Sequence, residues 1–314
     1  MKPLFWISQA WKMKTPSKEY AHKVIAFYDY IGRPLTVFEL WTALPRAKRP
    51  ETLHNLSHIV KELKDEQAVY EQEGILAVSR KEKGRAREER MLRDKMLEEK
   101  WKKILRLRWA FNLIPYLNFA CVSGSVSLGN VNKDSDVDIV IGCKKGRIFT
   151  VRLAVILLFG IMGKRRGAKD KKRESRDKFC FNHFVTEEAY ELSPPRTFYW
   201  EEIYTRMVPV YGNEKDIEKF FRANKWCGGE AVMLDKRWKK RDKTLASIIE
   251  WICWKEMGDI IEKIAKKIQL VRINAHQAPQ RGERIRISDE ELEFHGREEE
   301  FQKILKKLPV PTDL

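Results

Sequence analysis

The sequence lacks the features that mark a disulfide-stapled or zinc-binding protein. Its five cysteines stand far apart and form no C-x-x-C pair, and its six histidines show no spacing typical of metal ligands. Both absences argue against a disulfide framework and against a structural zinc site. Free thiols of this kind are typical of a reducing compartment, so we expect a cytoplasmic protein.

Long apolar segments are also missing. The longest run, residues 153–162, has about half of the ~20 residues that a bilayer crossing requires. The first residues, MKPLFWISQAWKMK, are interrupted by lysine and tryptophan and do not form the apolar region of a signal peptide. The sequence therefore predicts no membrane partner.

Positive charge is what the chain has in excess. Its 314 residues include 62 Lys and Arg against 45 Asp and Glu, a net charge of +17. A balance this basic favours a polyanionic partner, nucleic acid first and nucleotide phosphates behind it. The length and the 43% hydrophobic content are enough for two or three domains with real cores.

The most informative stretch is CVSGSVSLGNVNKDSDVDIVIG, residues 121–142. It predicts a short apolar strand, a turn at Gly124 and Ser125, a polar loop, and a second strand that opens with Asp136 and Asp138. Because side chains alternate along a strand, the two carboxylates face the same side, and Val137 and the isoleucines that follow face a core.

Two carboxylates without an opposing charge repel each other, and a cation between them relieves the repulsion. Mg²⁺, or Mn²⁺ in its place, takes one or two carboxylates together with substrate phosphates. Gly124 allows a close approach of the backbone to a ligand, and Ser125 and its neighbouring amides can hold phosphate oxygens. The competing interpretation is an ordinary hairpin with its acidic residues in water.

This order of strand, Gly-Ser turn, loop and Asp-x-Asp resembles the DNA polymerase β-like nucleotidyltransferase superfamily. Together with the segment DKFCFNHFV (residues 177–185) and the N-terminal region, it resembles nucleotidyltransferase-domain proteins of small-genome bacteria and archaea that carry a winged helix. The resemblance implies an α+β fold with a small mixed sheet. It also implies that Asp136 and Asp138 hold the metal and that Gly124 and Ser125 hold the nucleotide phosphates.

The resemblance has one defect. Superfamily enzymes carry a third carboxylate on a later strand, and here that strand offers Asn182, which can coordinate Mg²⁺ but cannot act as a base. Asp177, Glu187 and Glu188 stand at the ends of the strand, away from the expected position. For balancing the phosphate charge we consider Lys133, Arg147 and Arg152.

Residues 1–78 resemble a winged helix-turn-helix module of three helices and a hairpin, with a capping box at Thr36 and Glu39. Its third helix either contacts nucleic acid or docks a protein, and Glu71 and Glu73 on the wing argue against DNA.

The remaining chain divides into a charged helical connector (79–109), a nucleotidyltransferase-like domain (110–232) and a C-terminal helical region (233–314). The connector is either a solvated, salt-bridged helix or a nucleic-acid stripe. The basic segment 163–178 is either a solvated loop or a groove that attracts phosphates.

These patterns predict transfer of a nucleoside monophosphate from an NTP to an acceptor, with release of pyrophosphate. A nucleic-acid acceptor such as an RNA 3′ end fits the charge, and a protein acceptor is a second option. Asn182 favours an alternative without turnover, a DNA-binding nucleotide sensor. The basic surface allows a third interpretation, an RNA-binding scaffold. The sequence leaves the oligomeric state open.

Overall fold

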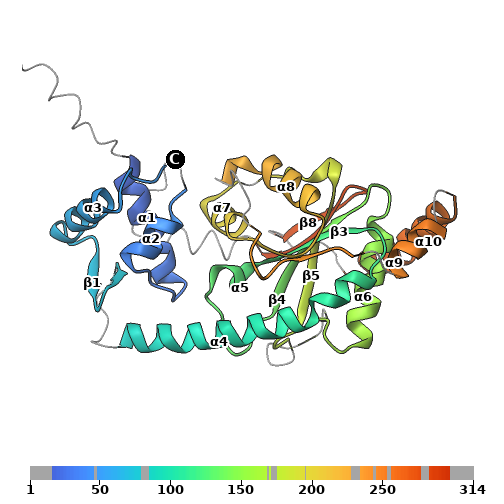
Figure 1. The fold of residues 1–314 in the computed structure, drawn as a ribbon, viewed down its shortest axis with the longest axis horizontal. Helices are drawn as coiled ribbons and strands as arrows, with labels where there is room; N and C mark the ends of the chain where they lie inside the picture. Colours follow the sequence, from blue (N-terminus) through green and yellow to red (C-terminus); the bar gives the residue numbers. More distant parts are fainter. Residues whose placement is uncertain are drawn as a thin grey trace, which may run out of the picture. The chain divides into compact units, whose positions relative to one another are not determined.

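A computed structural model gives the structure of the chain (Figure 1). It describes residues 16–45, 48–78, 85–167, 170, 175–194, 196–227, 234–242, 245–252, 256–276 and 283–297. The helix expected over 297–308 lies, apart from its first residue, outside these ranges. The chain divides into two units, residues 1–92 with 303–314 and residues 93–302.

The first unit contains three helices followed by a two-stranded antiparallel hairpin, in the order that the sequence predicts. The elements are α1 (Pro16–Tyr30), α2 (Val37–Ala43), α3 (Leu53–Asp65), β1 (Tyr70–Gln72) and β2 (Ile75–Ala77).

Local chemistry explains the bounds of these elements. The side chain of Thr36 accepts a hydrogen bond from the Glu39 N–H at 3.2 Å, and the Glu39 carboxylate accepts one from the Thr36 N–H at 2.9 Å. This is the predicted capping box, and α2 begins at the next residue. Glu73 and Gly74 have φ of 52° and 76°, as a two-residue hairpin turn requires.

The second unit is built on a seven-stranded mixed sheet with the order β7-β6-β3-β4-β5-β9-β8. The predicted small mixed sheet with helices is thereby confirmed. The strands are β3 (Leu117–Ser123), β4 (Val137–Cys143), β5 (Phe179–Thr186), β6 (Val208–Gly212), β7 (Lys239–Lys240), β8 (Glu283–Ile287) and β9 (Glu291–Arg297). The helices are α4 (Arg85–Leu107), which begins in the first unit, α5 (Gly124–Leu128), α6 (Ile148–Ile161), α7 (Phe198–Thr205), α8 (Glu214–Ala223), α9 (Leu245–Ile252) and α10 (Glu256–His276).

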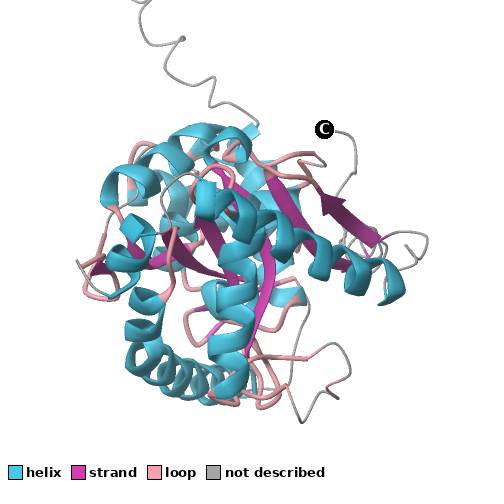
Figure 2. Cartoon of the chain, turned by 90° about the vertical axis from the view of Figure 1, so that its right-hand side faces the viewer, coloured by secondary structure: helices cyan, strands magenta, loops and turns pink. Residues whose placement is uncertain are grey.

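Helices cover both faces of this sheet, as Figures 1 and 2 show. One face packs on a large apolar cluster to which Ile139 of β4, Phe159 of α6 and Ala265 of α10 belong. On the other face, Phe119 of β3 packs against Phe220 of α8 with ring centroids 5.0 Å apart. The carboxylate of Asp138 lies on this second face, because Val137 and Ile139 point into the apolar cluster.

The connector is more than a solvated helix. Along α4, the side chains of Met96, Leu97, Trp101 and Ile104 pack on the apolar cluster. Lys100 is buried, and its Nζ donates to the Ser135 carbonyl at 2.6 Å and to Asp177 Oδ1 at 2.8 Å. Residues 93–107 therefore belong to the second unit and support the loop that precedes Asp136.

Two segments differ from the sequence-based expectation. Pro209–Gly212, whose proline and glycine are typical of a turn, lies in β6, where Val210 and Tyr211 are buried. The C-terminal region, expected to be helical, adds β7, β8 and β9 to the sheet. The alternation in Glu291-Leu-Glu-Phe294 is the signal for β9, because Leu292 and Phe294 pack on the apolar cluster and the glutamates face away from it.

No helix in the described ranges is both long enough and apolar enough to cross a membrane.

Candidate metal site

Strand pairing brings the predicted acidic residues to the centre of the sheet. β3 and β4 are antiparallel and pair Ser123 with Asp138, while β4 and β5 are parallel and pair Asp138 with Cys180. Asp136 directly precedes β4. The carboxylates therefore meet the end of β3 on one side and the start of β5 on the other.

Gly124 fits against the Asp138 carboxylate so closely that no side chain fits there. Its φ is +63°, and a Cβ at this position would stand 2.2 Å from Asp138 Oδ2. Ser125 follows in α5, half-buried, and its carbonyl accepts from the Asn130 N–H at 3.0 Å. The Gly-Ser backbone and the carboxylate pair, twelve residues apart in the sequence, thus form one site.

Arg166 is the partner of Asp136. Its Nη1 lies 2.5 Å from Asp136 Oδ2. The backbone around it is fixed, because the Arg166 N–H donates to the Phe179 carbonyl at 2.9 Å and the Phe179 N–H donates to the Lys164 carbonyl at 2.7 Å. The sequence pointed only to a basic segment here, and the pairing along β5 selects this one arginine from it.

The third group at the site is neutral. Among the described residues, Cys180 is the donor that groups with Asp136 and Asp138, with all three ligand atoms within 4.8 Å of one another. Asn182 lies beside them and donates from Nδ2 to Asp138 Oδ1 at 3.3 Å. The structure therefore brings Asn182 to the carboxylate pair, where the resemblance places it.

A bulge in β5 shapes this end of the strand. Asp138 pairs with Cys180 and Val140 with His183, so β5 advances three residues while β4 advances two. Phe181 and Phe184 consequently both enter the apolar cluster. Strict alternation would put His183 on the opposite side of the strand from Asn182, but His183 faces away from that cluster as Asn182 does.

The other carboxylates near β5 are engaged elsewhere. Asp177 forms ion pairs with Lys100 at 2.8 Å and Lys103 at 2.5 Å. Beyond the far end of the strand, Glu187 pairs with Lys219 at 2.6 Å. Glu188 likewise pairs with Lys145, at 2.7 Å. None of the three supplies the missing carboxylate.

Among the described residues, the one positive charge of Arg166 stands beside the two carboxylates of the pair. Burial and the adjacent charge of Asp136 raise the pKa of Asp138 to about 7. Arg166 and the hydrogen bonds from Cys180 and Asn182 lower it only in part. Burial and then the Asp138 charge also raise the pKa of Tyr199, which places this residue of α7 close to the site.

The cations considered for phosphate binding occupy different positions. Lys133 is exposed in the loop before Asp136. Arg147 pairs with Asp259 at 2.7 Å, and Arg152 is bonded to Gln269 Oε1 at 2.6 Å. Both arginines follow the Cys143 end of β4, whereas the carboxylates stand at its Val137 end. In the part of the chain that the structure describes, Arg166 is therefore the cation beside the pair.

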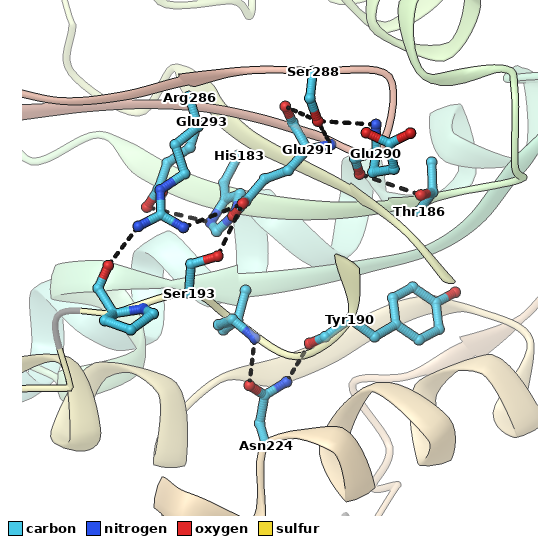
Figure 3. Close-up of polar contacts among 12 residues, drawn as sticks. His183, Thr186, Tyr190, Ser193, Asn224, Arg286, Ser288, Glu290, Glu291 and Glu293 are labelled. Atoms are coloured by element: carbon cyan, nitrogen blue, oxygen red, sulfur yellow. Dashed lines mark hydrogen bonds and ion pairs between the residues drawn. The ribbon is translucent and has the colours of Figure 1, made fainter. Parts of the chain in front are cut away.

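A second acidic pair with the same spacing lies on β9 (Figure 3). His183 Nε2 lies 3.0 Å from Glu291 Oε1. His183 Nδ1 lies 4.0 Å from Glu293 Oε1. Arg286 spans both carboxylates, with nitrogen to oxygen distances of 3.3 Å to Glu291 and 3.4 Å to Glu293. Glu291 and Glu293 are buried, and they lie in the C-terminal region that was expected to be helical, so their contact with His183 was not predicted.

The two pairs differ in what they can bind. Burial opposes ionisation of Glu291, yet His183 and Arg286 outweigh it and hold the pKa of Glu291 below its usual range. Arg286 contacts both Glu291 and Glu293, and His183 is hydrogen-bonded to Glu291, so both carboxylates of this cluster have partners within the fold. At Asp136 and Asp138 the donors are two carboxylate oxygens, with the Cys180 thiol and the Asn182 amide beside them. The carboxylate oxygens fit a hard divalent cation.

Comparison with protein families, with curated proteins and with solved structures gave no match to this chain.

Proposed function

We propose that the chain is a Mg²⁺-dependent nucleotidyltransferase that transfers a nucleoside monophosphate from an NTP to an acceptor hydroxyl. The observation that carries the proposal is the contact of the Gly124 backbone with the Asp138 carboxylate. This contact joins a segment suited to phosphate oxygens to a segment suited to a metal ion. The order of the motifs, which resembles the polymerase β-like superfamily, supports the same reading.

The charges at the site favour one divalent cation per chain. Asp136 and Asp138 bring two negative charges, Arg166 brings one positive charge, and Asn182 is neutral where a third carboxylate is expected. Asp136 and Asp138 would hold a single Mg²⁺, which would supply positive charge against the phosphate oxygens of the nucleotide. Mn²⁺ has the same preference for oxygen ligands and can replace it.

In the proposed reaction, the acceptor oxygen forms a bond to the α-phosphorus of the NTP. The bond from that phosphorus to the oxygen bridging the β-phosphate breaks, and pyrophosphate leaves with the electron pair. Gly124 and Ser125 hold the outer phosphates, and Arg166 stabilises the charge that develops on them. Asn182 cannot take the hydroxyl proton, so we infer that this proton passes to solvent.

Nucleic acid is the acceptor that the composition favours, because the net charge is +17. The first unit supports a winged-helix reading, in which the exposed side of α3 with His54, His58 and Lys61 contacts phosphates or bases. Glu71 on the hairpin pairs with Lys64 at 2.6 Å, which weakens its repulsion of a polyanion.

Label transfer tests the proposed activity. Purified protein is incubated with Mg²⁺ or Mn²⁺, each α-labelled NTP in turn, and RNA, DNA or protein acceptors. We expect transfer that falls roughly 10³-fold with Asp136→Asn or Asp138→Asn. Asp134→Asn is the matched control, because Asp134 stands in the same loop but outside the donor group, and it should retain transfer.

A nucleotide sensor is the second candidate, and the neutral Asn182 and Cys180 beside the carboxylates favour it. In the same assay it would bind an NTP with Mg²⁺ and transfer nothing to any acceptor. Nucleotide binding without transfer would therefore replace the first proposal with the second.

A further inference from the structure

Helices α9 and α10 carry an apolar surface that the rest of the described chain leaves uncovered. Of the twenty large apolar side chains that are exposed in the described residues, ten lie on these two helices. They are Ile248, Ile249, Trp251, Ile252, Met257, Ile260, Ile261, Ile264, Ile268 and Val271. Exposed apolar groups in this concentration mark an interaction surface.

The opposite side of α10 is held in place by polar contacts, so the helix cannot turn to bury this surface. The carboxylate of Glu262 accepts from the N–H groups of Phe149 and Thr150, both at 2.8 Å, at the start of α6. Gln269 Nε2 donates to the Phe149 carbonyl at 2.7 Å. Ala265, on the same side as these residues, is buried in the apolar cluster.

Helix α9 is fixed in the same way. Glu250 is buried and accepts from the Tyr116 N–H at 2.5 Å and from Lys144 Nζ at 2.9 Å. With Ala246 also buried, the outward side is left to Ile248, Ile252 and Trp251, whose exposed fraction is 79%.

The exposed residues of α10 have the spacing of a helix-pairing seam. Met257, Ile261, Ile264, Ile268 and Val271 follow one another at intervals of 4, 3, 4 and 3 residues. This is the a/d pattern of two helices that pack along their length, with Ile and Val or Met at each position. A seam of this kind, about 20 Å long at 1.5 Å per residue, fits another helix of equal length.

The charges beside the seam indicate which helix that is. Glu256 stands at the start of α10, and Lys263 and Lys267 stand further along it. Parallel pairing of two copies would set the lysines of one helix against those of the other. Antiparallel pairing brings the acidic start of each helix towards the basic half of its partner and also opposes the two helix dipoles.

We propose that α10 pairs antiparallel with α10 of a second copy of this chain, with α9 at the edges of the contact, to form a two-fold symmetric dimer. Such a self-complementary interface is the commonest form of protein oligomer. The inference does not depend on the proposed nucleotidyltransferase activity, since it uses no residue of the metal site.

Sedimentation equilibrium of the full chain tests the dimer. Twice the chain mass of 37.2 kDa is expected at micromolar concentration. Ile264→Glu places two like charges close together in the seam and should weaken dimerisation by roughly a hundredfold. Phe38→Glu is the matched control, an exposed apolar residue (64%) on α2, and should leave the dimer intact. A monomeric wild type, or a dimer unaffected by Ile264→Glu, overturns the proposal.

Orientation is tested by the distance between spin labels placed at position 256 of both copies. Antiparallel pairing predicts a separation of roughly 25 Å, and parallel pairing one of about 10 Å.

Thermal unfolding of Ile264→Glu distinguishes loss of the interface from loss of the fold. Since Ile264 is 54% exposed, the monomer should keep its cooperative transition, and a variant that unfolds without one is replaced by Ile268→Lys.

Discussion

Two acidic pairs on one face of the same sheet, Asp136 with Asp138 and Glu291 with Glu293, have opposite electrostatic fates. At Glu291 and Glu293, Arg286 contacts both carboxylates and His183 is hydrogen-bonded to Glu291. At Asp136 and Asp138, Arg166 reaches one carboxylate, and the pKa of Asp138 is raised to about 7. The spacing of two carboxylates alone does not predict a metal site. We propose that one arises at Asp136 and Asp138 because the described residues pair one of these carboxylates with an arginine, whereas Arg286 contacts both glutamates.

The largest expected effect is that of Gly124→Ala on metal binding by Asp136 and Asp138. The new Cβ would stand 2.2 Å from Asp138 Oδ2, so the carboxylate must move and Mn²⁺ affinity should fall at least about a hundredfold. Titration calorimetry measures the affinity. Gly146→Ala is the matched control, because Gly146 has a φ of +65° with nothing within 4 Å of its Cβ position. Equal losses in both variants would assign the effect to backbone strain alone.

The next prediction compares how much the arginine beside each acidic pair contributes to the stability of the fold. Arg286→Ala leaves Glu291 and Glu293 buried without their cation, and we expect a loss of about 3 kcal/mol in the free energy of unfolding. Arg166→Ala acts at a partly exposed ion pair and should cost less than about 1 kcal/mol. Urea denaturation measures both. A larger loss from Arg166→Ala than from Arg286→Ala would contradict the assigned roles.

Both metal affinity and stability should depend on pH through Asp138. Metal binding requires the ionised form of Asp138, whose pKa is raised to about 7, so apparent Mn²⁺ affinity should fall as pH drops below 7, towards tenfold per pH unit. The free energy of unfolding should change with pH in the opposite direction. A raised carboxyl pKa favours the folded state at low pH, and this contribution is lost as pH rises towards 7. Calorimetry at pH 5 and pH 8 measures the affinity of the wild type, and urea titration at the same two pH values should show that Asp138→Asn removes this contribution to stability.

The smallest expected effect is a gain. Asn182→Asp restores a third carboxylate beside Asp138 and should raise Mn²⁺ affinity about tenfold and admit a second ion. Asn132→Asp adds the same charge in the exposed part of the preceding loop and controls for a general electrostatic effect. An unchanged stoichiometry in Asn182→Asp would show that the missing carboxylate does not limit the number of ions.

Local patterns in the sequence predicted much of this architecture. Short-range patterns correctly predicted three features. They are the capping box at Thr36, the hairpin turn at Glu73 and Gly74, and strand β4, which begins directly after Asp136. Gly124 and Asp138 were predicted to converge, and strand pairing brings them together.

The features that the sequence did not predict depend on pairing between segments far apart in the chain. Arg166 reaches Asp136 because its backbone pairs with Phe179 at the start of β5, and no local signal distinguishes it from its basic neighbours. The bulge in β5 changed the side on which His183 lies. More than a hundred residues separate His183 from Glu291. Their contact could not be predicted without knowing that β9 pairs with β5 in the sheet.

The central claim is that the Asp136 and Asp138 pair binds one divalent cation. Electron paramagnetic resonance of Mn²⁺ titrated into the full chain counts bound ions directly, without requiring turnover or a known acceptor. We predict one Mn²⁺ per chain, lost in Asp138→Asn and retained in Asp134→Asn. Binding that survives Asp138→Asn, or no bound Mn²⁺ in the wild type at neutral pH, would contradict the account.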